Sequence, residues 1–346
     1  MPSEQIAMQQ IAQRLAELVN IPSSEIRFRT EATNVDGILE LGPFTFVIEW
    51  KGSGLAGPVA NAIEQVKRYA SQFTGAVPLV VVPYMGDTGK KHCKQADVAW
   101  MDLSGNARIY APGLRIRVEG KPNQFKKRGR PSSAFAPKSS RIARWLLMHP
   151  KEVFTQREIA VATGTDEGYT SKVIGKLRHD GLIIKDKSGN ISPRDPNILL
   201  EAWSESYDFS KHNIICGHIA ARSGEELLRK LSDSLKNASE KFAATGLAAA
   251  WLMDRFAAFR TTTIYLGKEP SPELLASLSF REEERGANVW LVAPKDEGVF
   301  HGASEIDGIR CVHPVQVWLD LKGHPERADE AAKKLRGSHL TWRNDD

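Results

Sequence analysis

The residues best suited to chemistry are two carboxylates and a lysine in the first part of the chain. Asp36 begins one expected strand, and Glu49 and Lys51 lie two residues apart on the next. Because successive side chains of a strand alternate between its faces, Glu49 and Lys51 share one face. Two carboxylates can hold Mg²⁺ through oxygen, and the metal with a nearby lysine can activate water for attack on a phosphodiester. Asp36 and Glu49 are therefore candidate metal ligands, and Lys51 is a candidate catalytic residue.

The sequence around these residues predicts the elements that would position them. A pair of strands turns at Gly42-Pro43, and a helix over 57–73 and a buried strand over 77–84 follow. This order of elements, with Asp36 followed by Glu49-Trp50-Lys51, resembles the common core of the PD-(D/E)xK nuclease superfamily. The resemblance implies a restriction-endonuclease-like α/β fold and, if the site is active, Mg²⁺ as its cofactor.

Two further residues of the expected helix extend the resemblance. Gln65 and Tyr69 match the Gln-x-x-x-Tyr signature of some members, which implies catalytic roles for both if the site is active. The alternative is structural, because loose sets of Asp, Glu and Lys also occur on half-exposed strands. Trp50 is bulky beside the expected metal position, and Glu17 is the best available third carboxylate. The fold and the activity are therefore separate predictions.

A helix-turn-helix is predicted in the middle of the chain. Apolar residues at helical spacing over 142–147 predict a first helix. Thr155-Gln156-Arg157-Glu158 fits the capping box that begins a helix, and Gly164 supplies the turn after it. A third helix is expected over 165–181, with its apolar residues facing inward and a partly cationic stripe facing outward.

Two short strands are expected directly after the third helix. The segments 182–184 and Ile191 flank a turn at Lys187-Ser188-Gly189-Asn190, as in the wing of a winged helix. A helix with small and cationic exposed residues can enter the major groove, while wing lysines contact phosphates. The alternative is a protein-docking module whose basic face is only solvated. The candidate DNA contacts are Tyr169, Thr170, Lys172 and Lys176 on the third helix and Lys185 and Lys187 on the wing.

A basic segment from Lys126 to Arg141 precedes these helices. Within it, Arg128-Gly129-Arg130-Pro131 resembles the core of an AT-hook. In that motif the glycine lets the backbone approach the minor-groove floor, and the two guanidiniums follow the negative potential of a narrow A·T groove. Arg128 and Arg130 are therefore candidate DNA contacts, with a solvated basic linker as the alternative.

The segment from Val98 to Ile109 carries a second family resemblance. Asp102 and Ser104-Gly105-Asn106 are typical of a tight turn between two strands, so a structural role is favoured for them. The segment resembles one that precedes the winged helix in AbiEi-like proteins, the antitoxin and regulator side of type IV toxin–antitoxin systems. The resemblance implies DNA binding at the operon's own promoter and neutralisation of a nucleotidyltransferase toxin.

Composition restricts the class of protein. The chain has 346 residues, of which 41% are hydrophobic and 26% charged, as in an ordinary globular protein of two or three domains. The net charge is only +5, so any argument for a nucleic-acid partner depends on where the charge lies. The three cysteines lack metal-ligand spacing, and no apolar run is long enough to cross a membrane. A cytoplasmic protein is expected.

The C-terminal part is predicted to be mixed α/β and to serve dimerisation or partner binding. It lacks the Gly-Ser followed by paired aspartates that a working nucleotidyltransferase needs, and His313 is expected to be structural. The predicted domains are a nuclease-like domain (1–121), a basic linker (122–138), a winged helix (139–205) and a C-terminal α/β domain (206–346).

These observations predict a multidomain α/β protein that regulates transcription as an AbiEi-like antitoxin and needs no cofactor to bind DNA. The expected partners are double-stranded DNA, a nucleotidyltransferase-like toxin and a second copy of the chain. One alternative is a Mg²⁺-dependent DNA endonuclease that uses Asp36, Glu49 and Lys51 and is targeted by the winged helix. The other is a protein-interaction adaptor that never touches DNA.

Overall fold

The chain folds into two compact units. The computed structural model describes residues 4–29, 35–125, 134–256, 258–283 and 285–342. The N-terminal unit comprises Met1–Pro131 and Leu177–Leu182, and the C-terminal unit comprises Ser132–Lys176 and Ile183–Asp346. Every helix among the described residues is too short or too polar to span a lipid bilayer. The predicted domain boundaries at 121, 138 and 205 stay predictions.

Seven strands of the N-terminal unit form one sheet whose spatial order follows the chain. β3, β4 and β5 run parallel, and every other neighbouring pair is antiparallel. Parallel neighbours need crossover connections, which α2 and α3 provide. The elements are α1 (Glu4–Val19), a 3₁₀ turn (Ser23–Glu25), β1 (Arg27–Arg29), β2 (Gly37–Leu41), β3 (Phe44–Trp50), α2 (Ala56–Ala70), β4 (Val77–Val82), α3 (Asp87–Gln95), β5 (Ala99–Asp102), β6 (Ala107–Ala111) and β7 (Leu114–Val118).

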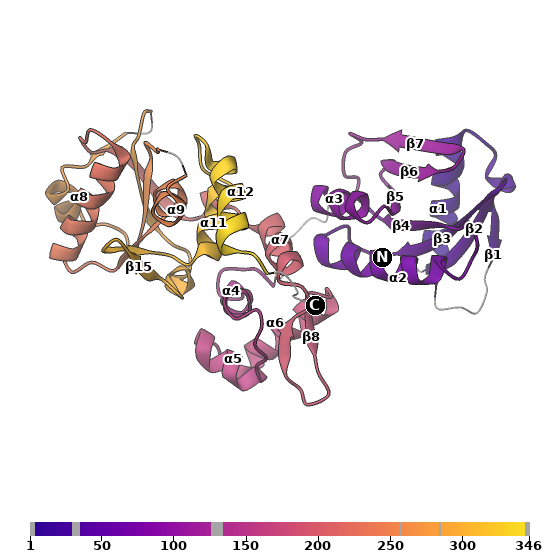
Figure 1. Ribbon diagram of the computed structural model, residues 1–346, viewed down its shortest axis with the longest axis horizontal. Coiled ribbons are helices and arrows are strands. Elements are labelled where there is room, and N and C mark those ends of the chain that lie inside the picture. The colour runs from indigo at the N-terminus through magenta and orange to yellow at the C-terminus, as the bar shows by residue number, and fades with distance from the viewer. Residues whose placement is uncertain (1–3, 30–34, 126–133, 257, 284, 343–346) are drawn as a thin grey trace. The chain divides into compact units, whose positions relative to one another are not determined.

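Helices cover both faces of this sheet. α1 buries Ile11 and Leu15 against the face that carries Phe46 and Ile48 of β3. α2 and α3, which lie side by side (Figure 1), cover the opposite face, where Val47 points. The alternation along β3 is the period of a strand buried on both sides. The expected β2–β3 turn at Gly42-Pro43 is confirmed.

The turn between β5 and β6 is built around Asp102. This fully buried carboxylate accepts hydrogen bonds from the backbone N–H groups of Met85 (3.1 Å) and Asn106 (2.9 Å). The Asn106 amide also donates to Asp102 and to the carbonyl of Lys121. Gly105 has φ +97°, which the turn requires and which a side chain rarely adopts. The structural role predicted for this segment is confirmed.

The helices and strands predicted for the winged helix all lie where expected. Ile142, Leu146 and Leu147 of the first helix are buried, as are Val173 and Ile174 of the third. The second helix begins at the predicted capping box. The elements are α4 (Ser140–Met148), α5 (Gln156–Thr163), α6 (Glu167–His179), β8 (Ile183–Lys185) and β9 (Ile191–Pro193).

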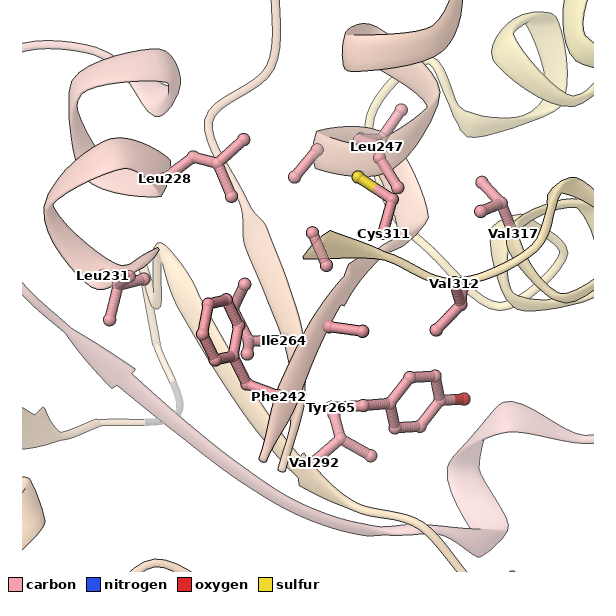
Figure 2. Close-up of a cluster of buried hydrophobic side chains, with 14 of the residues drawn as sticks. Leu228, Leu231, Phe242, Leu247, Ile264, Tyr265, Val292, Cys311, Val312 and Val317 are labelled. Carbon is pink, nitrogen blue, oxygen red and sulfur yellow. The ribbon is translucent and has the colours of Figure 1, made fainter. Parts of the chain in front are cut away.

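The rest of the C-terminal unit is built on a second seven-stranded sheet, in the order β13-β10-β14-β12-β11-β16-β15. Figure 2 shows Leu228 and Leu231 of α8 pointing toward Phe242 of β11 and Ile264 of β12 within the buried core. The elements are α7 (Pro196–Ser206), a 3₁₀ turn (Phe209–Lys211), β10 (Asn213–His218), α8 (Gly224–Asn237), β11 (Phe242–Thr245), α9 (Gly246–Asp254), β12 (Thr262–Leu266), α10 (Pro272–Ser277), β13 (Arg281–Glu282), β14 (Val289–Ala293), a 3₁₀ turn (Glu297–Phe300), β15 (Ser304–Ile306), β16 (Ile309–Cys311), α11 (Pro314–Leu321) and α12 (Ala328–His339).

Candidate nucleic-acid interface and carboxylate site

The turn between α5 and α6 is determined by local hydrogen bonds. The Thr155 hydroxyl accepts from the backbone N–H of Glu158 (3.2 Å), and the Glu158 carboxylate accepts from the backbone N–H of Thr155 (2.7 Å). These bonds satisfy the free donors at the start of α5. Gly164 follows with φ +62°, the left-handed conformation that ends a helix. The sequence therefore determines both ends of α5 and the start of the turn into α6.

A row of buried threonine hydroxyls connects the two helices. Thr165 bonds through its hydroxyl to Thr163 (2.9 Å) and to Thr170 (2.7 Å). Thr170 is fully buried and also donates to the carbonyl of Asp166 (2.8 Å). The prediction that Thr170 contacts DNA is therefore wrong, because its hydroxyl is used inside the protein to hold the start of α6.

The outward face of α6 is small and cationic. Gly168, Ser171, Lys172 and Gly175 are exposed at helical spacing, and Lys176 is half-buried beside them. A Cβ at Gly175 would meet no atom within 4 Å. Glycine inside a helix costs about 1 kcal/mol relative to alanine, and no packing among the described residues requires it here. Close approach of another molecule to this face would explain it.

Tyr169 is less accessible than the sequence suggests. Its hydroxyl lies 2.7 Å from the Ser139 hydroxyl, and the Lys138 ammonium lies 5.1 Å from its ring centroid. The ring is half-buried. Tyr169 therefore links α6 to the residues just before α4 and places Lys138 beside the start of α6.

The wing presents its two predicted lysines to solvent. Lys185 and Lys187 are exposed on either side of Asp186. The Asp186 carboxylate accepts from the backbone N–H (2.8 Å) and the side-chain amide (3.0 Å) of Asn190, and the backbone bond is the largest cause of its lowered pKa. These bonds close the turn without using either lysine. Arg128 and Arg130, the predicted AT-hook contacts, lie outside the described residues.

The structure brings Asp36, Glu49 and Lys51 together. Asp36 accepts a hydrogen bond from the backbone N–H of Trp50 (2.7 Å), which places it beside Glu49. Glu49 is 3% exposed and is paired with the Lys51 ammonium. The pKa of Glu49 is raised, and burial is the largest cause. The hydrogen bond from Lys51 lowers this pKa, and the charge of Asp36 raises it further. Asp36 is half-buried beside the buried Glu49. A divalent cation would offset the repulsion between these two carboxylates, so their oxygen donors fit Mg²⁺.

The other predicted members of this site lie on α2. Gln65 and Tyr69 are half-buried, and Tyr69 accepts a hydrogen bond from the Arg68 guanidinium (3.2 Å), whose charge also lowers the pKa of Glu49. Trp50 follows Glu49 in the sequence but packs on the α1 side of the sheet. It therefore does not crowd the expected metal position beside Glu49. Within the described ranges, no group of three His, Cys, Asp or Glu side chains is arranged to hold a metal.

Sequence reasoning missed a buried polar network in the C-terminal unit. Arg144 of α4 is 2% exposed and donates to the side-chain oxygen of Gln316 on α11 (2.5 Å). The Gln316 amide donates in turn to the fully buried Asp320 (2.7 Å). The hydroxyls of Tyr207 and Tyr265 also donate to Asp320. Burial raises the pKa of Asp320 to about 6. A buried arginine is therefore linked to a buried aspartate through one glutamine.

One further contact joins α4 to the second sheet, and another caps the start of α11. Arg141 makes a two-pronged ion pair with Asp296, both bonds 2.7 Å long, just after β14. His313 accepts from the backbone N–H of Val315 (3.2 Å), and burial lowers the pKa of His313 to about 4. The structural role predicted for His313 is confirmed.

Part of this unit is similar to a known protein family. Residues 194–341 match a family model described as "Transcriptional regulator, AbiEi antitoxin, Type IV TA system". No curated protein matches the chain, and no solved structure matches it. The match supports the AbiEi-like resemblance over the segment from α7 to α12, which contains Asp320 and Gln316, and it does not include residues 98–109. α4 to α6 and the whole sheet of the N-terminal unit lie outside the matched range.

Proposed function

We propose that this chain is a DNA-binding transcriptional regulator and the antitoxin of a type IV toxin–antitoxin pair. The observation that carries the DNA-binding part is the exposed face of α6, where Lys172 stands between Gly168 and Gly175. The match of residues 194–341 to the AbiEi family supports the regulator and antitoxin parts.

The elements α4 to β9 suit the docking geometry of a winged helix. In that geometry α6 lies in the major groove, where the small side chains of Gly168, Ser171 and Gly175 let its backbone approach the base edges. Lys172 would then contact a base edge or a phosphate. Lys185 and Lys187 on the wing would neutralise phosphates, which adds affinity and salt dependence but little sequence information. Tyr169 and Lys176, both half-buried, would line the edge of the interface.

The proposed partners follow from the same argument. Double-stranded DNA fits α6 and the wing, and the AbiEi family match supports a toxin encoded beside this chain. A nucleotidyltransferase-like toxin and a second copy of the chain are the partners proposed for the C-terminal unit. Arg128 and Arg130, in the segment that precedes α4 in the sequence, would add minor-groove contacts.

Regulation is tested with a reporter fused to the DNA upstream of the chain's own gene. Supplying the chain from a second plasmid should reduce reporter output several-fold, because a protein bound at the promoter blocks transcription. A variant with Lys172→Glu and Lys185→Glu, produced at the same level, should restore it. Reporter output that ignores the wild-type chain would contradict autoregulation.

The carboxylate site supports a second candidate function, a Mg²⁺-dependent DNA endonuclease. The observation that favours it is the meeting of Asp36, Glu49 and Lys51 at the start of β2 and the end of β3. Asp36 and Glu49 would hold the metal, which lowers the pKa of bound water and stabilises charge on the phosphate. Lys51 would orient the water, and Gln65 and Tyr69 would line the site from α2.

Replacing Lys51 with alanine should abolish any Mg²⁺-dependent cleavage of plasmid DNA, a loss of at least about 100-fold. Glu49→Gln should do the same, because it removes the metal-binding charge. Glu40→Gln on the neighbouring strand β2 is the matched control and should leave cleavage unchanged. Nicking that persists in EDTA or in the Lys51 variant would exclude this site as its source.

A further inference from the structure

One surface of the N-terminal unit carries an unusual alignment of arginines. β6 and β7 pair so that Arg108 lies opposite Arg117 and Tyr110 lies opposite Arg115. These four side chains point to the same face of the hairpin, which we call the basic hairpin face, while Ile109 and the other alternate residues point into the core. Tyr110, Arg115 and Arg117 are exposed, and Arg108 is half-buried.

This arrangement is unfavourable for an isolated fold. Like charges directly opposite each other on antiparallel strands destabilise the pair. Tyr110 offsets part of the cost, because the Arg108 guanidinium lies 4.3 Å and the Arg115 guanidinium 5.6 Å from its ring centroid. The ring therefore holds the two guanidiniums of Arg108 and Arg115 near one another on the hairpin.

The carboxylates nearby do not neutralise the face. Glu119 pairs with Arg117 at 3.1 Å, but both side chains are largely exposed, at 45% and 66%. Lys90 of α3 pairs with Asp87 at 3.0 Å. Its positive charge also helps to lower the pKa of Glu119, after the larger effect of the Arg117 hydrogen bond. Lys121, just after β7, is also exposed. Cations outnumber carboxylates across this surface.

The opposite edge of the same sheet provides a contrast. β1 also carries two exposed arginines two residues apart, Arg27 and Arg29. There Arg27 lies opposite Glu40, and Arg29 forms an ion pair with the same glutamate at 3.2 Å. The arginines of β1 therefore face a carboxylate, whereas those of β7 face an arginine and a tyrosine.

We propose that the basic hairpin face binds the phosphodiester backbone of DNA, as a second contact surface beyond α6 and the wing. Arginine forks match phosphate oxygens with paired N–H donors, and a polyanion would relieve the repulsion between Arg108 and Arg117. Base stacking on Tyr110 would add to single-strand binding. The inference rests on the proposal that the chain binds DNA, and it assigns part of that binding to the N-terminal unit.

The test uses the full chain and fluorescein-labelled DNA of mixed sequence, as a duplex and as the separate strand. Arg115→Gln with Arg117→Gln should weaken binding about tenfold and reduce the slope of log affinity against log salt by about 2. Arg27→Gln with Arg29→Gln is the matched control, because it removes two exposed strand arginines from the other edge. Thermal unfolding checks that both variants are folded at the temperature of the titration.

The outcomes separate this inference from the proposed function. Equal binding by the hairpin variant and the wild type, with binding still lost on substitution of Lys172 and Lys185, would overturn the inference alone. A wild-type chain that binds neither DNA would overturn both. If the hairpin variant loses affinity for the single strand only, the face is a surface for unpaired strands. If it loses affinity for both DNAs, the face is a general phosphate-binding surface.

Discussion

Replacing Arg144 with alanine should lower the free energy of unfolding of the C-terminal unit by about 3–5 kcal/mol, the range for breaking a buried charged network. The guanidinium lies 5.0 Å from the ring centroid of Trp203 and donates to Gln316. Its removal leaves Asp320 buried without the positive charge that Gln316 connects to it, and it also removes the packing of the arginine stem.

The effect should depend on pH with a defined sign. Burial raises the pKa of Asp320 in the folded state to about 6, above its ordinary value near 4. The folded state therefore holds this proton more tightly than the unfolded state, so stability falls as pH rises from about 4 to 6. Without Arg144 the charged aspartate is still less favourable, so the loss in the variant should be larger at pH 8 than at pH 5.

Urea unfolding followed by tryptophan fluorescence measures this effect. The control is a double variant, Arg144→Met with Asp320→Asn, which removes both charges and keeps most of the volume. It should recover much of the stability, because an apolar replacement of a whole buried pair is often neutral. A loss below about 1 kcal/mol in the Arg144→Ala variant at pH 8 would show that the network does not stabilise the unit.

Reversing the charge of two exposed lysines, Lys172→Glu on α6 and Lys185→Glu on the wing, should weaken binding to duplex DNA by about 100-fold or more. Each substitution removes a cation and places a carboxylate near phosphate. The matched control is Lys230→Glu with Lys334→Glu on α8 and α12, which are also exposed and change the net charge by the same amount. Equal losses in both variants would mean that net charge, and not this surface, governs binding.

Local signals predicted the elements around α6 well. The capping box of Thr155 and Glu158 and the left-handed Gly164 are properties of a few adjacent residues, so they can be recognised in the sequence. The turn at Asp102 and Asn106 is local in the same way. Asp36 and Glu49 also meet as predicted, because a short hairpin determines which residues of β2 and β3 lie near each other.

Features that depend on distant residues were not predictable. Arg144 is one basic residue on a short helix, and its partner Gln316 lies 172 positions away in the chain. The burial of Thr170 is a local feature that helical spacing alone does not reveal, since its hydroxyl bonds to Thr165 and to the carbonyl of Asp166. β10 and β11 carry weak sequence signals, since Asn213–His218 has no regular alternation and Phe242–Thr245 has only four residues.

We propose that this chain binds double-stranded DNA through α6 and the wing. The most direct measurement is an anisotropy titration of the full wild-type chain on labelled duplex from upstream of its own gene, in EDTA and across a salt series. We expect binding that needs no metal and weakens with salt, with a log–log slope of about −3 or steeper, the value for three or more phosphate contacts. Absence of binding at low salt, to this or any other duplex, would contradict the proposal that the chain binds DNA. The protein-interaction adaptor would then be the favoured function.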